Sequence, residues 1–313
     1  MIGEEFLWTE RYRPHKVDDC VLPESLKTTF KQYVLQGNVP NHTFSGGPGM
    51  GKTTVAKAIL DEIGADYYVV NGSLNGNIDT LRNEISTFAS SVSLMGGRKY
   101  VIIDEADGLN PLSTQPSLRS FIEEYSSNCG FILTCNLKNK IVSALQSRCP
   151  VIDFKIDKAD KQKIAGAFFK RVCAILTQEN IEFDKAVVAE LIQKYFPDFR
   201  ETLGQLQRYS ACGRIDSGIL CNLHDVSIKE LIGFMKEKNF TSVRKWVAEN
   251  SDADPATVFR NFYNTASEYF TKGTIPALVM IIGKYQYQAS FVACPEINNA
   301  AFCVEVMIEC EFV

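Results

Sequence analysis

A glycine-rich run between an apolar stretch and a helical stretch constrains this chain more than any other feature. Residues 46–53 are Gly-Gly-Pro-Gly-Met-Gly-Lys-Thr, which fits the pattern G-x-x-x-x-G-K followed by Ser or Thr. Glycines let the backbone curl so that consecutive N–H groups point at one place, at the positive end of the following helix. Such a loop binds phosphate groups. Lys52 is placed to reach the β- and γ-phosphates of a nucleotide, and the Thr53 hydroxyl to hold Mg²⁺.

A second motif, residues 100–105, is an apolar run that ends in two carboxylates. Acidic strand ends are common by themselves, but nucleotide hydrolysis needs an acid that supports Mg²⁺ and a base beside the attacking water. We therefore expect Asp104 to support the metal and Glu105 to activate water. Asn136 ends another apolar run, where its amide either contacts the γ-phosphate and orients the water or caps the loop.

Short β-rich runs alternate with helical stretches over the first 155 residues. Residues 100–103, Tyr-Val-Ile-Ile, are continuously apolar, as a parallel sheet covered on both faces requires. The pattern predicts an α/β domain, a parallel sheet sandwiched between helices, over residues 1–156. We expect its strands at residues 42–45, 67–71, 99–104, 130–136 and 151–155.

The strand signal fades after residue 156. Residues 157–225 are predicted to form a small helical domain from amphipathic segments at 161–177, 185–196 and 201–211.

Residues 226–313 are predicted to form a third, helical domain. Asp254 and Pro255 indicate a helix start, and Gly273 is expected to end that helix. Between them an apolar stripe recurs at helical spacing, made of Val258, Phe262, Ala266 and Phe270 and widened by Phe259 and Tyr269. The nearly apolar run at 275–282 suits a helix buried either in a bundle or at a subunit interface.

Charge and cysteine usage exclude several classes of protein. The chain carries 33 basic and 37 acidic residues and a net charge of −4, so it is not a strongly basic nucleic-acid coat protein, although a local basic patch is compatible. Its ten cysteines include no C-x-x-C pair, which favours reduced, structural thiols over zinc modules. No apolar run reaches the roughly 18 residues of a membrane span, and the first residues lack a secretory signal. We therefore expect a cytoplasmic protein with no membrane partner.

The motifs resemble, in order, those of AAA+ ATPases of the sliding-clamp-loader type, from Trp8 to about Tyr209. Residues 8–14 resemble the family's adenine-side segment, and residues 46–54 and 103–107 its Walker A and DExD Walker B motifs. Asn136 falls at sensor 1. Residues 147–149, Ser-Arg-Cys, match the clamp-loader SRC signature, and residues 198–200, Asp-Phe-Arg, match sensor 2. The chain looks most similar to the large subunits of loaders from T-even-like bacteriophages.

The resemblance implies roles for residues that are otherwise anonymous. Arg148, by composition an exposed surface arginine, would act as an arginine finger in the ATP site of a neighbouring subunit, and such help is worth ~10³–10⁵ in rate in other nucleotide hydrolases. Arg200 would contact the nucleotide from the lid domain, unless charge pairing at a helix start explains it. Adenine, ribose and phosphates would be bound by Thr9, Glu10, Arg11, Tyr12, Val21, Gly49, Met50, Gly51, Lys52, Thr53 and Thr54.

The resemblance also implies an assembly. Four copies would join one different small subunit through their C-terminal collar domains, bind ATP and Mg²⁺, open a sliding clamp and grip primer–template DNA. Hydrolysis would then release the closed clamp for the polymerase. Arg119 matches a position that couples neighbouring subunits, with a helix-surface arginine as the alternative.

The contacts with DNA and clamp are implied by position as well. The DNA backbone would be tracked by Arg82, Asn77, Ser113 and Thr114, although Asn77 is uncharged where a basic residue would help. The clamp would dock on Val92, Leu94 and Met95, unless these apolar residues pack in the core.

Two alternatives exist for the whole chain. Residues 104–107, Asp-Glu-Ala-Asp, spell the tetrad of one helicase group, which raises an AAA+ helicase or remodelling motor; the single phosphate loop, the helical lid and the SRC run speak against it. The other alternative is a scaffold subunit that binds ATP without hydrolysing it. Lys52, Asp104, Glu105 and Asn136 are all present, which disfavours the scaffold.

Overall fold

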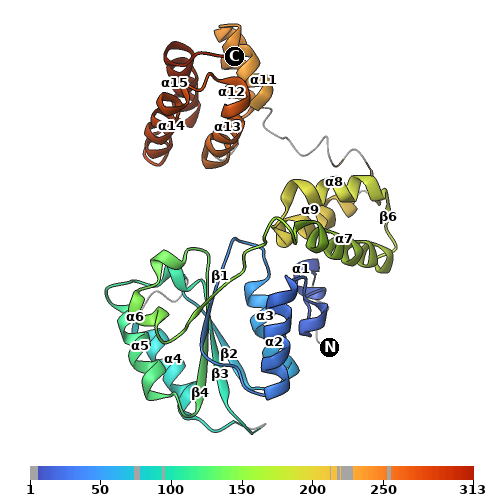
Figure 1. The fold of residues 1–313 in the computed structure, drawn as a ribbon, viewed down its shortest axis with the longest axis vertical. Coiled ribbons are helices and arrows are strands. Elements are labelled where there is room, and N and C mark those ends of the chain that lie inside the picture. Colours follow the sequence, from blue (N-terminus) through green and yellow to red (C-terminus); the bar gives the residue numbers. More distant parts are fainter. Residues whose placement is uncertain are drawn as a thin grey trace. The chain divides into compact units, whose positions relative to one another are not determined.

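The computed structural model describes residues 6–73, 78–93, 96–211, 213–216, 219, 228–251 and 255–313, without the side chains of residues 78–82 and 267. The chain divides into two compact units, Met1–Ile219 and Leu220–Val313, and we describe each by itself (Figure 1). Among the described residues, no helix is both long enough and apolar enough to span a bilayer.

A five-stranded parallel sheet forms the centre of the first unit, in the strand order β2-β3-β4-β1-β5. Ser45 pairs with Cys135 and Ile103 with Leu133, so the carboxyl ends of β1, β3 and β4 reach the same edge of the sheet. This sheet confirms the predicted α/β class. The strands are β1 (His42–Ser45), β2 (Tyr67–Asn71), β3 (Lys99–Asp104), β4 (Cys129–Cys135) and β5 (Val151–Asp153).

Helices cover both faces of this sheet, with α2 and α3 on one face and α4 and α5 on the other (Figure 1). Along β3, Ile102 packs into the core under α2 and α3, whereas Val101 and Ile103 pack into the core on the opposite face. Because alternate residues enter opposite cores, the strand is continuously apolar. The helices are α1 (Trp8–Arg11), α2 (Glu24–Gln36), α3 (Lys52–Glu62), α4 (Ile78–Ser90), α5 (Thr114–Glu124) and α6 (Ser143–Gln146), with 3₁₀ turns η1 (Val17–Asp19), η2 (Ala106–Gly108) and η3 (Lys138–Lys140).

A small helical lid completes the first unit, with helices close to the predicted segments. The Asp184 side chain caps α8 by accepting the N–H of Ala186 at 2.8 Å, and Asp198 caps α9 by accepting the N–H of Glu201 at 2.9 Å. The elements are α7 (Lys161–Gln178), α8 (Lys185–Tyr195), α9 (Phe199–Ser210) and the short parallel pair β6 (Glu182–Phe183) and β7 (Arg214–Ile215).

The second unit is helical, as the sequence predicted. Its core includes the predicted stripe of α13, where the rings of Phe259 and Phe262 meet Phe302 edge to face, with centroids 5.0 and 5.1 Å apart. The described helices are α11 (Ile228–Lys236), α12 (Phe240–Glu249), α13 (Pro255–Tyr269), α14 (Ile275–Ala289) and α15 (Pro295–Glu309).

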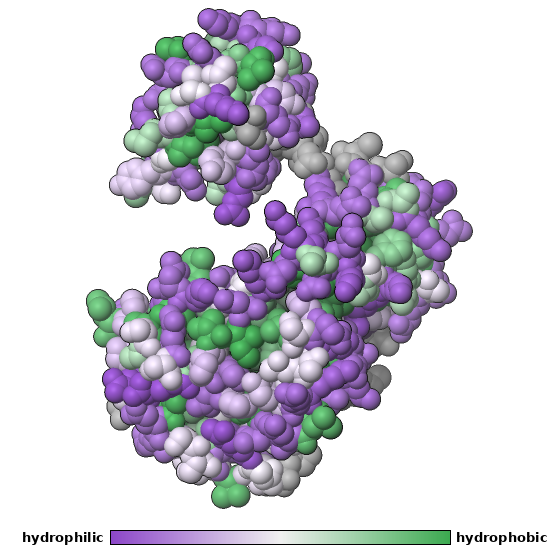
Figure 2. Space-filling view, viewed as in Figure 1, coloured by the Kyte–Doolittle hydropathy of each residue, from purple (hydrophilic) through white to green (hydrophobic). Residues whose placement is uncertain are grey.

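Two expectations for this unit are changed by the structure: the end of α13, and the burial of the apolar run at 275–282. Helix α13 ends at Tyr269 rather than at Gly273, because Phe270 leaves the helix to form an antiparallel bridge with Phe312. Asp254, the expected cap, lies outside the described residues. The apolar run at 275–282 is split: Leu278 is buried in the core, whereas Met280 is 77% exposed. In the view of Figure 2 the surfaces of both units are largely hydrophilic, with hydrophobic residues in small groups.

The cysteines of the described residues are free thiols, as expected. Cys149 in the SRC run is buried, and burial raises its pKa to about 12. The thiol therefore stays neutral and packs as a small apolar side chain.

Candidate functional site

A cavity of about 560 Å³ opens at the carboxyl edge of the sheet and is closed on one side by the lid. It gathers residues from segments that are far apart in the sequence: the N-terminal segment, the phosphate loop, the ends of β3 and β4, and helices α7 and α9. Of the predicted site residues, the cavity is lined by Thr9, Glu10, Tyr12, Val21, Gly49, Met50, Gly51, Lys52, Thr53, Thr54, Asp104, Glu105, Asn136 and Arg200.

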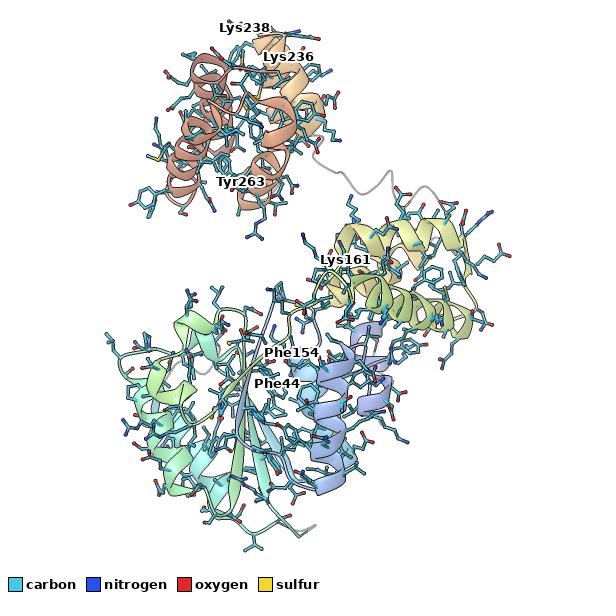
Figure 3. All side chains as sticks on the ribbon, viewed as in Figure 1. Phe44, Phe154, Lys161, Lys236, Lys238 and Tyr263 are labelled. Atoms are coloured by element: carbon cyan, nitrogen blue, oxygen red, sulfur yellow. The ribbon has the colours of Figure 1, made fainter. Side chains whose placement is uncertain are left out.

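The glycines of the phosphate loop are required by its conformation. Gly49 and Gly51 have φ angles of 65° and 84°, in the left-handed region that glycine enters without strain. A Cβ on Gly49 would lie 1.7 Å from Oδ1 of Asp198, at the start of α9. A Cβ on Gly46 would lie 2.9 Å from that of Phe154, which packs on Phe44 (Figure 3).

Lys52 is nearly buried, and its ammonium group donates to three oxygens. The distances from Nζ are 2.9 Å to the carbonyl of Gly46, 2.7 Å to that of Gly47 and 2.8 Å to Oδ1 of Asn136. Desolvation lowers the pKa of Lys52, while nearby Cys135 and Asp104 act in the opposite direction. A phosphate group would offer this cation charged acceptors in place of neutral ones. The sequence predicted Lys52 and Asn136 separately, and the fold brings them into contact.

The carboxyl end of β3 holds the acidic pair. Oγ1 of Thr53 donates to Oδ1 of Asp104 at 2.7 Å, and the Thr134 hydroxyl donates to the same oxygen. Glu105 is exposed and has a φ angle of 53°, again in the left-handed region. Oδ2 of Asp107 accepts the N–H groups of Asn136 and Leu137 at 3.2 and 3.1 Å, which ties η2 to the end of β4.

The donor set at this point fits Mg²⁺. A hydroxyl and a carboxylate oxygen lie side by side, and Mg²⁺ prefers a few hard oxygen ligands completed by substrate phosphates. Within the described residues, no cluster of three or more His, Cys, Asp or Glu side chains could hold a metal by itself. Thr53 and Asp104 would therefore hold the ion together with a bound nucleotide.

Residues 9–22 form one side of the cavity, which we call the N-terminal wall, and hydrogen bonds attach this segment to the lid. The Gln207 side chain accepts the N–H of Trp8 at 2.9 Å, and Glu179 accepts from Arg11 at 2.7 Å and from the Tyr12 hydroxyl. Burial, followed by this hydrogen bond to Glu179, raises the pKa of Tyr12. Arg11 is not among the residues that line the cavity, and its guanidinium pairs with Glu179 of the lid instead.

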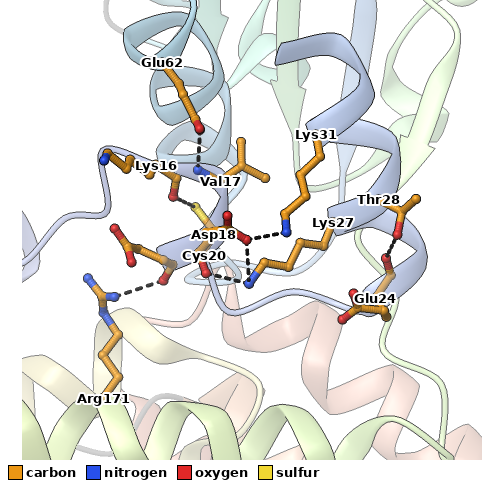
Figure 4. A network of polar contacts seen from close by, with 11 residues as sticks. Lys16, Val17, Asp18, Cys20, Glu24, Lys27, Thr28, Lys31, Glu62 and Arg171 are labelled. Carbon is orange, nitrogen blue, oxygen red and sulfur yellow. Dashed lines mark hydrogen bonds and ion pairs between the residues drawn. The ribbon is translucent and has the colours of Figure 1, made fainter. Parts of the chain in front are cut away.

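Arg171 of α7 contacts two backbone carbonyls of the same wall. Its guanidinium donates to the carbonyl of Tyr12 at 2.8 Å. It also donates to the carbonyl of Asp19 at 2.9 Å, which is the hydrogen bond drawn from Arg171 in Figure 4. On the opposite side of the segment, Glu62 accepts the N–H of Val17 at 2.9 Å, so the segment is tied to both the lid and α3. Sequence reasoning missed Arg171, Glu179 and Gln207, because their partners lie more than 150 residues away and no local motif marks them.

Arg148 lies outside the cavity of its own chain. Its Nε donates to Oε1 of Glu123 at 2.5 Å, and its Nη1 donates to the carbonyl of Ala144 at 2.9 Å. Nε of Arg119 lies 3.7 Å from the same carboxylate oxygen. The hydrogen bond from Arg148 is the main cause that lowers the pKa of Glu123. We call Arg119, Glu123 and Arg148 the arginine edge.

The residues predicted to contact DNA and clamp have mixed placements. Ser113 is exposed, but Thr114 is completely buried at the start of α5, so its side chain cannot reach DNA unless that helix end opens. Arg82 lies on α4, and its side chain is not among those described. Val92 is 86% exposed and does not pack in the core. Asn77, Leu94 and Met95 lie outside the described residues.

Two family models match the first unit. The model of ATPases associated with various cellular activities (AAA) matches residues 42–156. The model of the AAA+ ATPase lid domain of sliding-clamp-loader large subunits matches residues 160–221.

Proteins of similar sequence include two from bacteriophages. The sliding-clamp-loader large subunit of Enterobacteria phage T4 is 35% identical over 314 residues, which cover 99% of this chain and 98% of the relative. That of Escherichia phage RB69 is 41% identical over 247 residues, or 77% of each chain. The Replication factor C small subunit of Sulfurisphaera tokodaii is 31% identical over 260 residues, covering 79% of this chain and 77% of the relative.

Solved structures of similar fold include a mutant of RuvB from Thermotoga maritima. It has a TM-score of 0.53 at 20% sequence identity and covers 67% of this chain and 72% of its own. Another match of this kind, with a TM-score of 0.50, is described as a Holliday junction branch migration motor. At this identity the likeness shows the common AAA+ fold and says nothing of branch migration by this chain.

Proposed function

Because this chain belongs to the sliding-clamp-loader large subunits, a family of AAA+ ATPases, we propose that ATP binding in its cavity opens a sliding clamp and grips primer–template DNA. Hydrolysis then releases the closed clamp for the replicative polymerase. The observation that carries the proposal is the convergence of Lys52, Asn136, Thr53 and Asp104 in one cavity while Arg148 lies outside it. The expected place of action, the cytoplasm of the host cell, stays a prediction.

Each residue around the nucleotide has a role in this proposal. Lys52 leaves its carbonyl acceptors to bind the β- and γ-phosphates, and Asn136 orients the γ-phosphate and the attacking water. Thr53 and Asp104 would hold Mg²⁺, which would supply positive charge to neutralise the phosphates. Glu105 accepts the proton of the attacking water. Arg200 reaches the phosphates from the lid, on the exposed start of α9.

Arg148 acts in trans in this proposal. It would enter the ATP site of the next subunit, since it cannot line its own, and Arg119 would couple the same pair of subunits. The complex would contain four copies of this chain and one different small subunit. Residues 226–313 would form the collar that joins them, after a nucleotide-binding domain at 1–156 and a lid at 157–225.

DNA and clamp binding complete the proposal. Arg82, Asn77 and Ser113 would follow the DNA backbone without reading bases, which predicts salt-sensitive, sequence-independent binding. The clamp would dock at Val92, Leu94 and Met95. The exposed position of Val92 supports this role over core packing.

The decisive experiment is steady-state ATP hydrolysis by the purified full chain, alone and with primer–template DNA, the cognate clamp and the small subunit. We expect strong stimulation only when DNA and clamp are both present. If neither DNA nor clamp changes the rate of ATP hydrolysis, the chain is still an ATPase, but the proposed clamp-loading cycle is wrong. In a parallel assay we expect no ATP-dependent strand separation, and unwinding by the chain alone would favour the helicase alternative.

A further inference from the structure

We infer that Thr134, which belongs to neither nucleotide motif, is a positioning residue for hydrolysis. Its single hydroxyl holds the metal-supporting acid and the general base in one arrangement. The inference rests on the proposed function of Asp104 and Glu105 and deepens it, by naming the residue that fixes their positions relative to each other.

The parallel pairing of β3 and β4 brings Thr134 to this place. Ile103 pairs with Leu133, so the next residues along the two strands, Asp104 and Thr134, lie beside each other. Thr134 is 1% exposed. Its hydroxyl donates to Oδ1 of Asp104 and accepts the backbone N–H of Glu105 at 3.2 Å. One hydroxyl has one proton and two lone pairs, so it can satisfy both partners at once.

Glu105 needs such support because of its backbone. Its φ and ψ angles, 53° and 44°, lie in a region that residues with side chains enter rarely. Two hydrogen bonds hold the turn: the N–H of Glu105 donates to Thr134, and its carbonyl accepts the N–H of Gly108 at 2.9 Å. Glu105 is exposed and lines the cavity.

Asp104 is held from both sides. Thr53 of the phosphate loop and Thr134 of β4 donate to the same carboxylate oxygen. The Thr53 hydroxyl is the one that would bind Mg²⁺, so Thr134 is the partner that keeps the carboxylate in place when the metal site fills. A buried threonine hydroxyl needs some partner in any protein, and the experiment must therefore separate positioning from simple packing.

The test compares Thr134→Val, which keeps the shape and removes the hydroxyl, with Thr134→Ser, which keeps the hydroxyl. Both are made in the full chain and assayed under the conditions that give wild-type turnover. We expect Thr134→Val to lower kcat about 10- to 100-fold, as loss of a hydrogen bond to a charged group does. KM for ATP should stay within about 3-fold, and Thr134→Ser should keep kcat within about 3-fold of wild type, because its hydroxyl can still meet both partners.

Three results would overturn the inference: wild-type kcat in Thr134→Val, an equal loss in the Ser variant, or a loss of ATP affinity that matches the loss of kcat. Thermal unfolding followed by circular dichroism checks that each variant folds. Thr134→Ala serves as a second hydroxyl-free variant if Val does not fit, with the same loss of kcat expected.

Glu105→Gln, assayed in parallel, separates this inference from the proposed function. If Glu105→Gln keeps its turnover, Glu105 is not the general base, and the positioning role of Thr134 loses its basis. A dead Glu105→Gln beside a fully active Thr134→Val would leave the proposed base intact and refute the role of Thr134 alone.

Discussion

The ATP cavity and the arginine edge belong to the same α/β domain, but their charges are satisfied in different ways. In the cavity, nearly buried Lys52 has three oxygen acceptors and Asp104 has two hydroxyl donors, all from one chain. At the arginine edge, Arg148 pairs with the exposed carboxylate of Glu123. Buried charges must be paired to be tolerated, whereas an exposed pair is easily exchanged for another partner.

Under the proposed function, this difference would let one chain carry two parts of a catalytic site that neighbouring subunits share. The residues that line the cavity all come from this chain, so under the proposed function it would bind nucleotide before assembly. Arg148 is 26% exposed beside the more exposed Glu123, and under the proposed function a phosphate of the nucleotide in a neighbouring subunit would replace Glu123.

The largest effect is expected from Arg148→Ala. We expect hydrolysis by the assembled complex to fall by ~10³–10⁵ while ATP binding by the mutated subunit is unchanged, because the arginine stabilises transition-state charge in another subunit's site. Turnover of the complex and titration with a fluorescent ATP analogue measure the two quantities. Weakened binding in the mutated subunit itself would contradict a trans role.

Mixed complexes test the same point directly. Subunits with Arg148→Ala keep an intact cavity, and subunits with Lys52→Ala keep an intact arginine edge, so mixing them should restore part of the activity. Absence of restoration at every ratio would count against action across an interface.

Within the cavity, Glu105→Gln is expected to lower kcat by ~10²–10⁴, the range typical of a general base. ATP binding should be nearly unchanged, since the amide keeps the shape of the side chain and Lys52, Thr53 and Asp104 are untouched. Steady-state kinetics separate kcat from KM. A fall in affinity as large as the fall in kcat would show that Glu105 binds nucleotide rather than activating water.

A smaller effect is expected from Arg171→Gln, which releases the N-terminal wall from the lid. Loss of two hydrogen bonds from a cationic group should raise KM for ATP about 10-fold with kcat within about 2-fold. Lys170→Gln removes the same charge from an exposed neighbouring position on α7 and should change neither value. A fall in kcat without a change in KM would disprove this wall-holding role.

The smallest effect is expected from Glu123→Gln, which frees Arg148 in the isolated chain. Turnover of the complex should rise by no more than ~3-fold, because an exposed ion pair restrains little. The pKa of Glu123 is lowered by Arg148, so the pair is intact above the ordinary carboxyl range and opens only as pH falls through the lowered pKa. Between about pH 6 and 8 it should add no pH dependence. Glu124→Gln is the matched control, and a 10-fold loss in Glu123→Gln would mean that Glu123 aims the arginine.

Much of the fold followed from local pattern. The strand boundaries were predicted closely because a sheet buried on both faces demands continuous apolar runs. Helix α8 was predicted closely because its amphipathic period is a local signal. The end of α13 was wrong because the bridge from Phe270 to Phe312 is set by a distant segment.

The candidate site divides in the same way. Lys52, Thr53 and Asp104 were predicted because loop and strand chemistry mark them within a few residues. Thr134 and Arg171 were missed because their partners come from another strand or from the N-terminal segment. Arg11 and Thr114 were placed by motif position, but the structure turns one toward Glu179 and buries the other.

The chemistry of the phosphate loop, the acidic strand end and the class of the fold can be read from the amino-acid sequence, because they depend on residues that are neighbours along the chain. Three further features depend on how the chain packs: Thr134 contacts both Asp104 and Glu105, the lid contacts the N-terminal wall, and Arg148 lies outside its own cavity. Strand order and helix packing bring distant residues together, and no local pattern records which ones meet.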